Sequence, residues 1–229
     1  MSPRLNTAKL CGILLESGES MKELILVRHG ESEHHVQGLT GGWTNTGLTD
    51  LGKKQAELTG YRLQSFVHSR TPVFYASDLN RAVQTAQIIG SIIGINPQFE
   101  ESLREMNWGI AIDMTLKKAQ ELELEKTEPL IDWVPFPGAE SRRMLYERLS
   151  KYLDVIEEKL EDFVIIVSHG NAIKSCIYWW LEIPLAMQSQ LDFDIDAGSI
   201  THLRINDWEE KTLSLLNSSD HLLSFTSTK

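Results

Sequence analysis

Two apolar segments of this 229-residue chain end in the same way. Residues 24–27 and 163–167 are all Leu, Ile, Val or Phe, and each run is followed two residues later by His-Gly. Continuous apolar runs of this length predict strands that are buried on both faces, as in a parallel sheet. Ligands bind outside the carboxyl ends of such strands. We therefore expect His29 and His169 to meet at one point, with Gly30 allowing the backbone to turn and a ligand to come close.

Apolar residues recur at helical spacing in the segments between these strands. The pattern predicts helices at about 50–68, 79–93, 139–160 and 171–181, and a weaker one near 115–125. Strands are expected at 22–28, 72–76, 97–101, 163–167, 199–205 and 212–216. Thr49 and Ser77 are interpreted as helix N-caps, and Gly94 as a helix end. This alternation predicts an α/β fold, a three-layer α/β/α sandwich with a largely parallel central sheet.

Residues 31–49 separate the first strand from the first helix and are rich in Gly, Thr and His. A loop longer than about 12–15 residues without regular structure is usually functional. Residues 106–136 are also less regular than the rest of the chain. The adjacent pair His34-His35 in the first loop is interpreted as solvated, and no metal site is expected there.

Composition narrows the classes of partner. The chain is 41% hydrophobic and 24% charged, which is ordinary for a globular protein. The net charge of −10 argues against nucleic acid or an anionic membrane as the main partner. Two cysteines, Cys11 and Cys176, fit a reducing cytoplasm, and no apolar run reaches the roughly 20 residues of a membrane helix. We expect a poorly ordered extension at 1–20 and a single domain at 21–229, with Met21 as an alternative start.

The residues after the predicted strands suit phosphoryl transfer. A phosphoryl group in transfer spreads negative charge over its oxygens and needs fixed cations and donors around it. Arg28, Arg81 and His169 are candidates for that role, and Arg81 lies near a predicted helix start. An imidazole can act as the nucleophile, and Glu105 can protonate the leaving group. This scheme requires no metal or other cofactor.

Five motifs in the expected order resemble the histidine phosphatase family, which includes the cofactor-dependent phosphoglycerate mutases. The resemblance covers about residues 22–221, and its motifs are Arg28-His29-Gly30, the segments 77–82 and 84–86, Leu103-Arg104-Glu105, the segment 137–141, and Ser168-His169-Gly170. It implies that His29 is the phosphorylated histidine and that Glu105 and His169 complete the catalytic set. It also implies phosphate contacts from Arg28, Arg81, His169, His35 and Asn171, and a substrate loop at Gly41, Gly42 and Trp43.

The chain departs from the family pattern at several positions. His35 stands where the family often has Asn, Asn45 replaces the usual Asp of the mutases' Gly-Trp loop, and residues 111–113 replace a common Trp-Glu-Gly. Residues 105–141 contain no arginine, whereas the mutases carry an Arg-Arg pair in a longer lid there. The missing arginines favour a phosphatase, although Gly42-Trp43 and Asn171 are mutase-like.

The sequence therefore predicts a cytoplasmic, metal-independent phosphomonoester hydrolase that works through a phosphohistidine on a small phosphorylated metabolite. A cofactor-dependent phosphoglycerate mutase and a non-catalytic phosphate-binding regulatory module are the alternatives. A homodimer is one of the assemblies that we expect for this protein. Since variable loops determine what surrounds the phosphate, the sequence does not identify the substrate.

Overall fold

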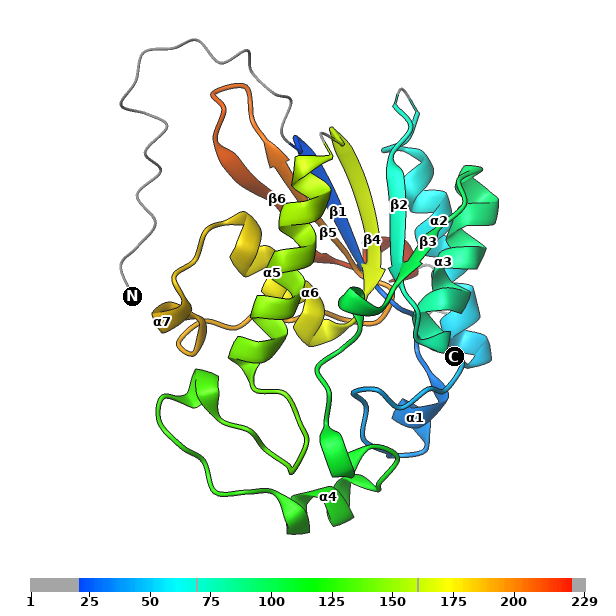
Figure 1. Cartoon of the computed structure of the whole chain (residues 1–229). Coiled ribbons are helices and arrows are strands. Elements are labelled where there is room, and N and C mark those ends of the chain that lie inside the picture. The colour runs from blue at the N-terminus through cyan, green and yellow to red at the C-terminus, as the bar shows by residue number, and fades with distance from the viewer. Residues whose placement is uncertain (1–20, 69, 160, 224–229) are drawn as a thin grey trace, which may run out of the picture.

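A six-stranded mixed sheet forms the centre of the molecule in the part of the chain that the computed structural model describes, residues 21–68, 70–159 and 161–223 (Figure 1). The strand order is β3-β2-β4-β1-β5-β6. The strands are β1 (Glu23–Arg28), β2 (Val73–Ser77), β3 (Gln98–Glu100), β4 (Phe163–Ser168), β5 (Ile200–Ile205) and β6 (Lys211–Ser218). The pairs β1–β4, β2–β4 and β2–β3 are parallel, whereas β5 is antiparallel to both of its neighbours. The predicted α/β class with a largely parallel sheet is confirmed.

Helices cover both faces of the sheet. The larger ones are α2 (Asp50–Gln64), α3 (Asn80–Ile93), α5 (Arg142–Glu158) and α6 (Gly170–Trp180), and the short ones are α1 (Glu33–Val36), α4 (Leu116–Leu122) and α7 (Leu185–Gln188). Short 3-10 turns occur at Glu101–Leu103, Gly109–Ala111, Leu130–Asp132 and Asp220–Leu222. In Figure 1, α1 and α4 lie beyond the carboxyl ends of β1 and β4, where the sequence predicts the site.

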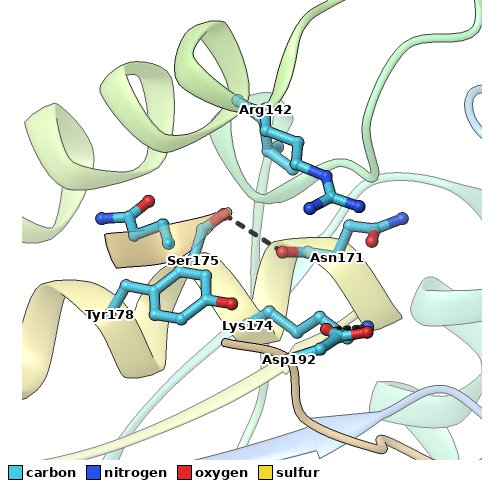
Figure 2. A pocket seen from close by; sticks show the side chains of 8 residues that line it. Arg142, Asn171, Lys174, Ser175, Tyr178 and Asp192 are labelled. Atoms are coloured by element: carbon cyan, nitrogen blue, oxygen red, sulfur yellow. Dashed lines mark hydrogen bonds and ion pairs between the residues drawn. The ribbon is translucent and has the colours of Figure 1, made fainter. Parts of the chain in front are cut away.

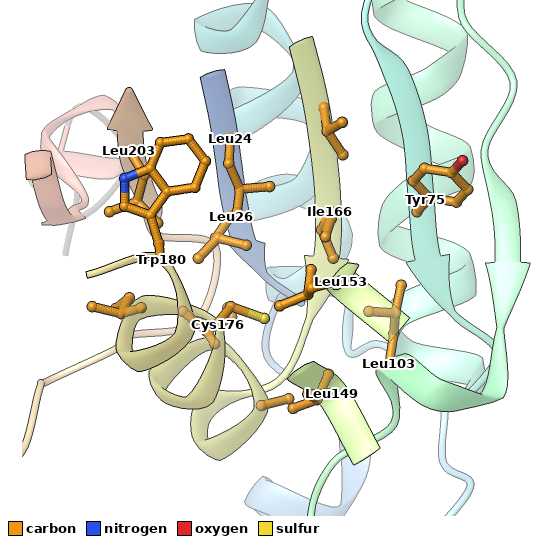
Figure 3. Close-up of a cluster of buried hydrophobic side chains, with 14 of the residues drawn as sticks. Leu24, Leu26, Tyr75, Leu103, Leu149, Leu153, Ile166, Cys176, Trp180 and Leu203 are labelled. Carbon is orange, nitrogen blue, oxygen red and sulfur yellow. The ribbon is translucent and has the colours of Figure 1, made fainter. Parts of the chain in front are cut away.

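Alternate residues of β1 supply the two halves of the core, because successive side chains of a strand point to opposite faces. Leu24 and Leu26 pack with α5 and α6, in a cluster that also holds Leu149, Cys176 and Trp180 (Figure 3). The second cluster, on the other face, receives Ile25 and Val27 together with side chains of α2 and α3. Both faces of β1 and β4 are thus buried, which explains why their sequences are apolar without alternation.

Helix ends in the structure agree with the sequence prediction at Thr49 and Gly94 and differ from it at Ser77. The Thr49 hydroxyl accepts a hydrogen bond from the backbone N–H of Gly52, so the predicted cap of α2 is confirmed. Gly94 ends α3 with a φ of 75°, as predicted. The predicted Ser77 cap is wrong, because the N-cap of α3 is Leu79. The Ser77 hydroxyl accepts from the backbone N–H of Leu79 at 3.3 Å, before the helix, and lies 2.8 Å from Nε2 of His169. The loop at 31–49 contains the short helix α1.

The predicted extension at residues 1–20 lies outside the described residues. The described segments contain no helix that is long and apolar enough to cross a membrane.

Candidate active site

The register of β1 against β4 brings the two His-Gly segments together. Arg28 lies opposite Ser168, and the backbone N–H of His29 donates to the carbonyl oxygen of Ser168 at 3.0 Å. The imidazole centroids of His29 and His169 are 5.0 Å apart, with an edge-on arrangement. The two imidazoles therefore meet as the strand pattern predicts, because parallel strands that pair residue for residue end at the same level.

Gly30 allows close packing at this point. A Cβ atom at Gly30 would lie 2.3 Å from the carbonyl oxygen of Gly52, and a Cβ at Gly52 would lie 1.9 Å from the carbonyl oxygen of Glu31. The absence of both side chains lets the start of α2 lie directly against the turn after β1. Close packing of α2 beside His29 thus requires glycine at position 30, whereas the approach of a ligand there stays a prediction.

Hydrogen bonds fix the tautomer of His29. Its Nδ1 lies 2.7 Å from the carbonyl oxygen of Gly30, which can only accept, so Nδ1 carries the proton. Arg81 Nε donates to Nε2 of His29 at 3.1 Å, in agreement with a lone pair there. Burial lowers the pKa of His29 well below its usual value, and the positive charges of Arg81 and Arg28 act in the same direction. His29 is thus neutral near pH 7, with Nε2 as a free nucleophilic nitrogen once Arg81 turns to another acceptor.

The guanidinium of Arg81 is held by carbonyl oxygens. Nη1 donates to Thr44 O at 2.5 Å and Nη2 to Gly42 O at 2.8 Å, so the loop after α1 orients the group. Arg81 is 1% exposed, and burial lowers its pKa to about 10, so it remains charged. Within the described residues it forms no salt bridge. A buried cation without a carboxylate partner costs free energy unless an anion binds beside it.

Arg28 and His35 form the opposite wall. Arg28 Nη1 donates to Ile195 O at 2.5 Å, and Nη2 lies 3.3 Å from Nε2 of His35. Burial lowers the pKa of Arg28, and its Nε is buried without a partner in the described chain. Burial also lowers the pKa of His35 to about 4, followed by the effect of the Arg28 charge. The His35 ring stacks 5.8 Å from that of His29, so a neutral imidazole occupies the position where the family often has Asn.

His169 lies behind His29 and is completely buried. Its Nε2 is 2.8 Å from the Ser77 hydroxyl, which is the use of Ser77 that replaces the predicted capping role. Its Nδ1 is buried and has no hydrogen-bond partner among the described residues. Burial lowers the pKa of His169 well below its usual value, with Arg81 and Arg28 as further causes, so this imidazole is also neutral.

Backbone N–H groups hold the carboxylate of Glu105. Oε1 accepts from Met106 N at 2.8 Å, and Oε2 accepts from Asn171 N at 3.1 Å, in the first turn of α6. The backbone carbonyl of Glu105 accepts from the indole of Trp43 at 2.8 Å and from Arg148 Nη2 at 3.1 Å. Glu105 is therefore fixed from both ends, and its carboxylate faces the same pocket as His29.

Sequence reasoning missed Arg148 and did not explain Glu140. Arg148 on α5 also donates to the carbonyls of Ser102 and Arg104, and it pairs with both carboxylate oxygens of Glu140 at 2.9 Å. Glu140 in turn accepts from Asn107 N at 2.8 Å. The signal in the sequence was an arginine directly beside the apolar stripe of a helix, where it is only 20% exposed.

These groups surround a pocket of about 270 Å³. Its lining residues are Arg28, His29, His34, His35, Leu39, Gly41, Gly42, Arg81, Glu105, Trp108, Leu116 and Asn171. Two predicted site residues are not in this lining. His169 lies behind His29, and Trp43 turns away so that the Arg104 guanidinium stacks on its ring at 4.7 Å.

The interpretation of His34-His35 as a solvated pair is wrong for His34. The ring is 4% exposed and lies near the hydroxyls of Ser32 and Thr46, at 2.9 and 3.1 Å from Nδ1. Burial lowers its pKa to about 3, so it is neutral as well. No group of three or more His, Cys, Asp or Glu side chains suited to a metal ion occurs in the described parts of the chain.

Residues 105–141, which we call the flap, close one side of the pocket. The flap is attached to the loop after α1, because Leu39 bridges Thr115 and the Thr40 hydroxyl donates to Ala111 O at 2.5 Å. Besides Glu105, the flap contributes only the apolar side chains of Trp108 and Leu116 to the pocket lining. This wall excludes water from one side but offers no cation.

Comparison with known proteins agrees with this geometry. The model of the histidine phosphatase superfamily (branch 1) matches residues 24–218, which is most of the chain. A Cytophaga hutchinsonii 2,3-bisphosphoglycerate-dependent phosphoglycerate mutase is 35% identical over 167 residues, or 68% of this chain and 75% of the mutase. The chain therefore belongs to the histidine phosphatase superfamily.

Relatives with phosphatase names align over more of the chain. A Hydrogenobacter thermophilus protein provisionally assigned as phosphoserine phosphatase 2 is 26% identical over 90% of this chain and 100% of its own length. The crystal structure of a phosphoserine phosphatase from Entamoeba histolytica in complex with 3-phosphoglyceric acid matches with a TM-score of 0.71 and 25% identity, covering 88% of this chain and all of that chain. The family and these neighbours identify this protein as a phosphatase of the histidine phosphatase family.

Proposed function

We propose that this protein is a metal-independent phosphomonoesterase that acts through a phosphohistidine on a small phosphorylated metabolite. The single observation that carries the proposal is the neutral His29 imidazole, whose Nε2 accepts from the buried guanidinium of Arg81, a cation that has no carboxylate partner in the described chain. Such a site binds an oxyanion next to a nucleophile. The phosphatase neighbours, among them one whose crystal structure holds 3-phosphoglyceric acid, support a small phosphate ester as substrate.

In this mechanism the phosphate displaces Arg81 from Nε2 of His29, and its oxygens accept from Arg81, Arg28 and His35. Nε2 forms a bond to phosphorus while the bond from phosphorus to the leaving oxygen breaks. The carbonyl of Gly30 stabilises the Nδ1 proton as positive charge develops on the ring. His169 contributes its buried Nδ1 to the phosphoryl oxygens, since that nitrogen has no other partner in the described residues.

Glu105 supplies the proton to the leaving oxygen, and its backbone anchors hold it in place for that transfer. In the second half of the reaction the same carboxylate takes a proton from water, which attacks phospho-His29 and regenerates the free imidazole. Asn171 and the glycines at 41 and 42 border the space that the rest of the substrate would occupy.

A rapid-quench experiment tests this proposal. The enzyme is mixed with ³²P-labelled p-nitrophenyl phosphate in the presence of a chelator and quenched in alkali within the first turnovers. We expect one acid-labile, alkali-stable phosphate per chain, and no label in His29→Asn. His68→Asn, at an exposed histidine outside the pocket, is the control and should label normally. Full turnover by His29→Asn, or activity that a chelator abolishes and a divalent ion restores, would contradict the mechanism.

Two alternatives have specific observations in their favour. The 35% identity to a mutase and the presence of Asn171 after His169-Gly170 favour phosphoglycerate mutase activity from the same phosphohistidine. The replacement of the usual Asn by His35 favours a binding module without turnover. Repeated release of phosphate by each enzyme molecule would exclude the second alternative.

A further inference from the structure

A segment outside the sheet sets the place of the Arg28 guanidinium. Residues 189–199, between α7 and β5, form neither helix nor strand, and we call them the 189–199 segment. Part of the segment lines a pocket of about 360 Å³ together with Arg28 and Glu105. The Ile195 carbonyl in this segment accepts from Nη1 of Arg28. The guanidinium has one other hydrogen-bonding neighbour in the described chain, Nε2 of His35, which itself belongs to the proposed phosphate site.

Helix α6 holds the first half of the 189–199 segment. Lys174 forms a 2.6 Å ion pair with Asp192, and Figure 2 shows the two side chains joined beside α6. The Tyr178 hydroxyl donates to the carbonyl oxygen of Leu191 at 2.7 Å. The Ile195 side chain is buried in the core cluster that also receives Leu24. These contacts fix the segment as far as Ile195.

Asn217, near the end of β6, holds the second half. Its Oδ1 accepts from the backbone N–H of Asp196 at 2.6 Å, and its Nδ2 donates to Oδ2 of the same residue at 2.9 Å. That N–H and the carbonyl of Ile195 belong to one peptide group, which is planar. Arg28 therefore bonds to one side of this peptide and Asn217 to the other, so the Asn217 side chain fixes the plane of the carbonyl that orients Arg28.

The backbone of β6 is shaped to present Asn217. Ile200 of β5 pairs with Ser218, but His202 pairs with Leu215, so β6 has one residue more than β5 in this stretch and forms a bulge. Asn217 lies within the bulge and has a φ of 50°, in the left-handed region that Asn adopts more readily than most residues. Bulges beside active sites often redirect a side chain, and this one directs Asn217 to Asp196.

The carboxylate of Asp196 is a potential competitor of phosphate for Arg28. Both side chains line the 360 Å³ pocket. Burial lowers the pKa of Arg28, and the charges of Glu105 and Asp196 oppose this effect, so the Asp196 charge is felt at the guanidinium. Yet Asp196 forms no ion pair with Arg28 within the described residues, where its Oδ2 accepts from Asn217. An ion pair between them would occupy N–H groups that a bound phosphate needs.

We propose that Asn217 is a positioning residue for phosphate binding: it fixes the peptide that orients Arg28, and it keeps the Asp196 carboxylate from pairing with Arg28. The proposal rests on the function proposed above, because it takes the ligand of Arg28 to be a phosphate group. Asn217 lines neither pocket that contains Arg28, so it acts only through the 189–199 segment.

Calorimetric titration with inorganic phosphate tests the proposal on the full chain. Asn217→Gly removes the side chain but tolerates the positive φ. We expect its Kd for phosphate to rise by about tenfold over wild type, since a cation that orients the anion loses its place. kcat/KM for p-nitrophenyl phosphate should fall by a similar factor.

Asn206→Gly is the matched control. Asn206 lies at the other end of the β5–β6 hairpin, where its Oδ1 accepts from the backbone N–H groups of Trp208 and Glu210 and its Nδ2 donates to Glu210. The variant thus loses a comparable set of hydrogen bonds, but none near Arg28. Its Kd for phosphate should equal that of wild type.

A second substitution separates positioning from a general loss of structure. Asp196→Asn removes the competing charge, so in the Asn217→Gly background it should recover most of the lost phosphate affinity. Should Asn217→Gly not fold, the exchanged pair carries the test. Asn217→Asp alone brings two carboxylates together and should weaken phosphate binding, whereas Asn217→Asp with Asp196→Asn rebuilds both hydrogen bonds and should bind as wild type does. A wild-type Kd in Asn217→Gly, or a loss that Asp196→Asn does not reduce, would overturn the proposal.

Phosphate binding does not require turnover, so the two proposals can fail separately. If wild type binds phosphate but hydrolyses no ester, a weaker Kd in Asn217→Gly and its recovery by Asp196→Asn would uphold the positioning role while the phosphatase function fails. Hydrolysis of p-nitrophenyl phosphate, with the same phosphate Kd in Asn217→Gly as in wild type, would overturn the positioning role alone. A wild-type protein that binds no phosphate would overturn both.

Discussion

At the scale of single residues, the site depends on keeping imidazoles neutral among cations. His29, His34 and His169 are at most 4% exposed, and burial is the main cause that lowers the pKa of each. The next cause is Arg81 for His29 and His169, and His35 for His34. Near pH 7 these imidazoles are neutral in both the folded and the unfolded chain, but burial and the nearby cations oppose their protonation in the folded chain at lower pH. The proposed nucleophilicity of His29 and the expected sensitivity of the fold to acid therefore have the same origin.

The lowered pKa values of the buried histidines predict how the free energy of unfolding depends on pH. In the unfolded chain these histidines take up protons below about pH 6.5, whereas in the folded chain they do not until a lower pH. The unfolded state then binds more protons, so the free energy of unfolding falls as the pH drops below 6.5, by up to about 1.4 kcal/mol per pH unit for each such histidine. We expect denaturant titrations between pH 7.5 and 5.5 to show this loss.

Variants assign the effect to particular side chains. His29→Asn should reduce the slope of unfolding free energy against pH by about one proton, while the exposed His68, changed to Asn, should leave it as in wild type. An unchanged slope in His29→Asn would mean that His29 is protonated in the folded protein. The proposal that His29 is a neutral nucleophile would then be wrong.

At the scale of elements, α5 determines where Glu105 stands. Arg148, two turns into the helix, ties the backbone carbonyls of Ser102, Arg104 and Glu105 to one guanidinium and balances it with Glu140. Arg148 and Glu140 are 20% and 13% exposed, so this pair is mostly shielded from water. The helix thus acts on the proposed proton donor through its backbone, without contact to the pocket.

We therefore expect Arg148→Met to lower the stability of the fold and to weaken protonation of the leaving group by Glu105. Leaving Glu140 buried without its partner should destabilise the fold by roughly 3 kcal/mol. If Arg148 positions Glu105, hydrolysis of alkyl phosphates should fall more than that of p-nitrophenyl phosphate, whose good leaving group needs no proton. Glu105→Gln is the reference, with an expected loss of about 10²–10⁴-fold on alkyl esters.

Arg143→Met is the control for a surface ion pair on the same helix, because Arg143 and Asp132 are 35% and 41% exposed. It should change stability by less than about 1 kcal/mol and leave the ratio of alkyl to aryl ester hydrolysis unchanged. Equal losses on both ester types in Arg148→Met would make Arg148 a purely structural residue.

At the scale of the whole molecule, the sheet positions the residues of the proposed phosphate site, and the flap closes one side of its pocket. Of the flap residues only Glu105, Trp108 and Leu116 line the pocket. The flap's lysines, Lys117, Lys118 and Lys126, are exposed and do not line it. A mutase must hold its dephosphorylated intermediate until His29 returns the phosphate, which needs closure and cations around the substrate.

We therefore expect hydrolysis to exceed isomerisation. Supplied with 3-phosphoglycerate and a catalytic amount of 2,3-bisphosphoglycerate, the enzyme should release free phosphate faster than it forms 2-phosphoglycerate. Both products are followed in one time course. Isomer formation that exceeds phosphate release by roughly tenfold, a barrier difference of about 1.4 kcal/mol, would instead identify a mutase.

The sequence by itself determined the class of fold and pointed to the residues of the candidate site. Apolar runs without alternation predict strands buried on both faces, and β1 and β4 are such strands. Because strand periodicity and strand ends are local properties, the approach of His29 to His169 followed from the chain alone. The family motifs also lie within short segments, so they could be located without a structure.

Only the tertiary structure decided which of these residues face the pocket and what holds them. Trp43 turns away to stack under Arg104, Ser77 bonds to His169 instead of capping a helix, and Arg148 reaches a segment more than forty residues earlier. Such contacts depend on how distant segments pack against each other, and no local pattern of hydrophobic and polar residues records that.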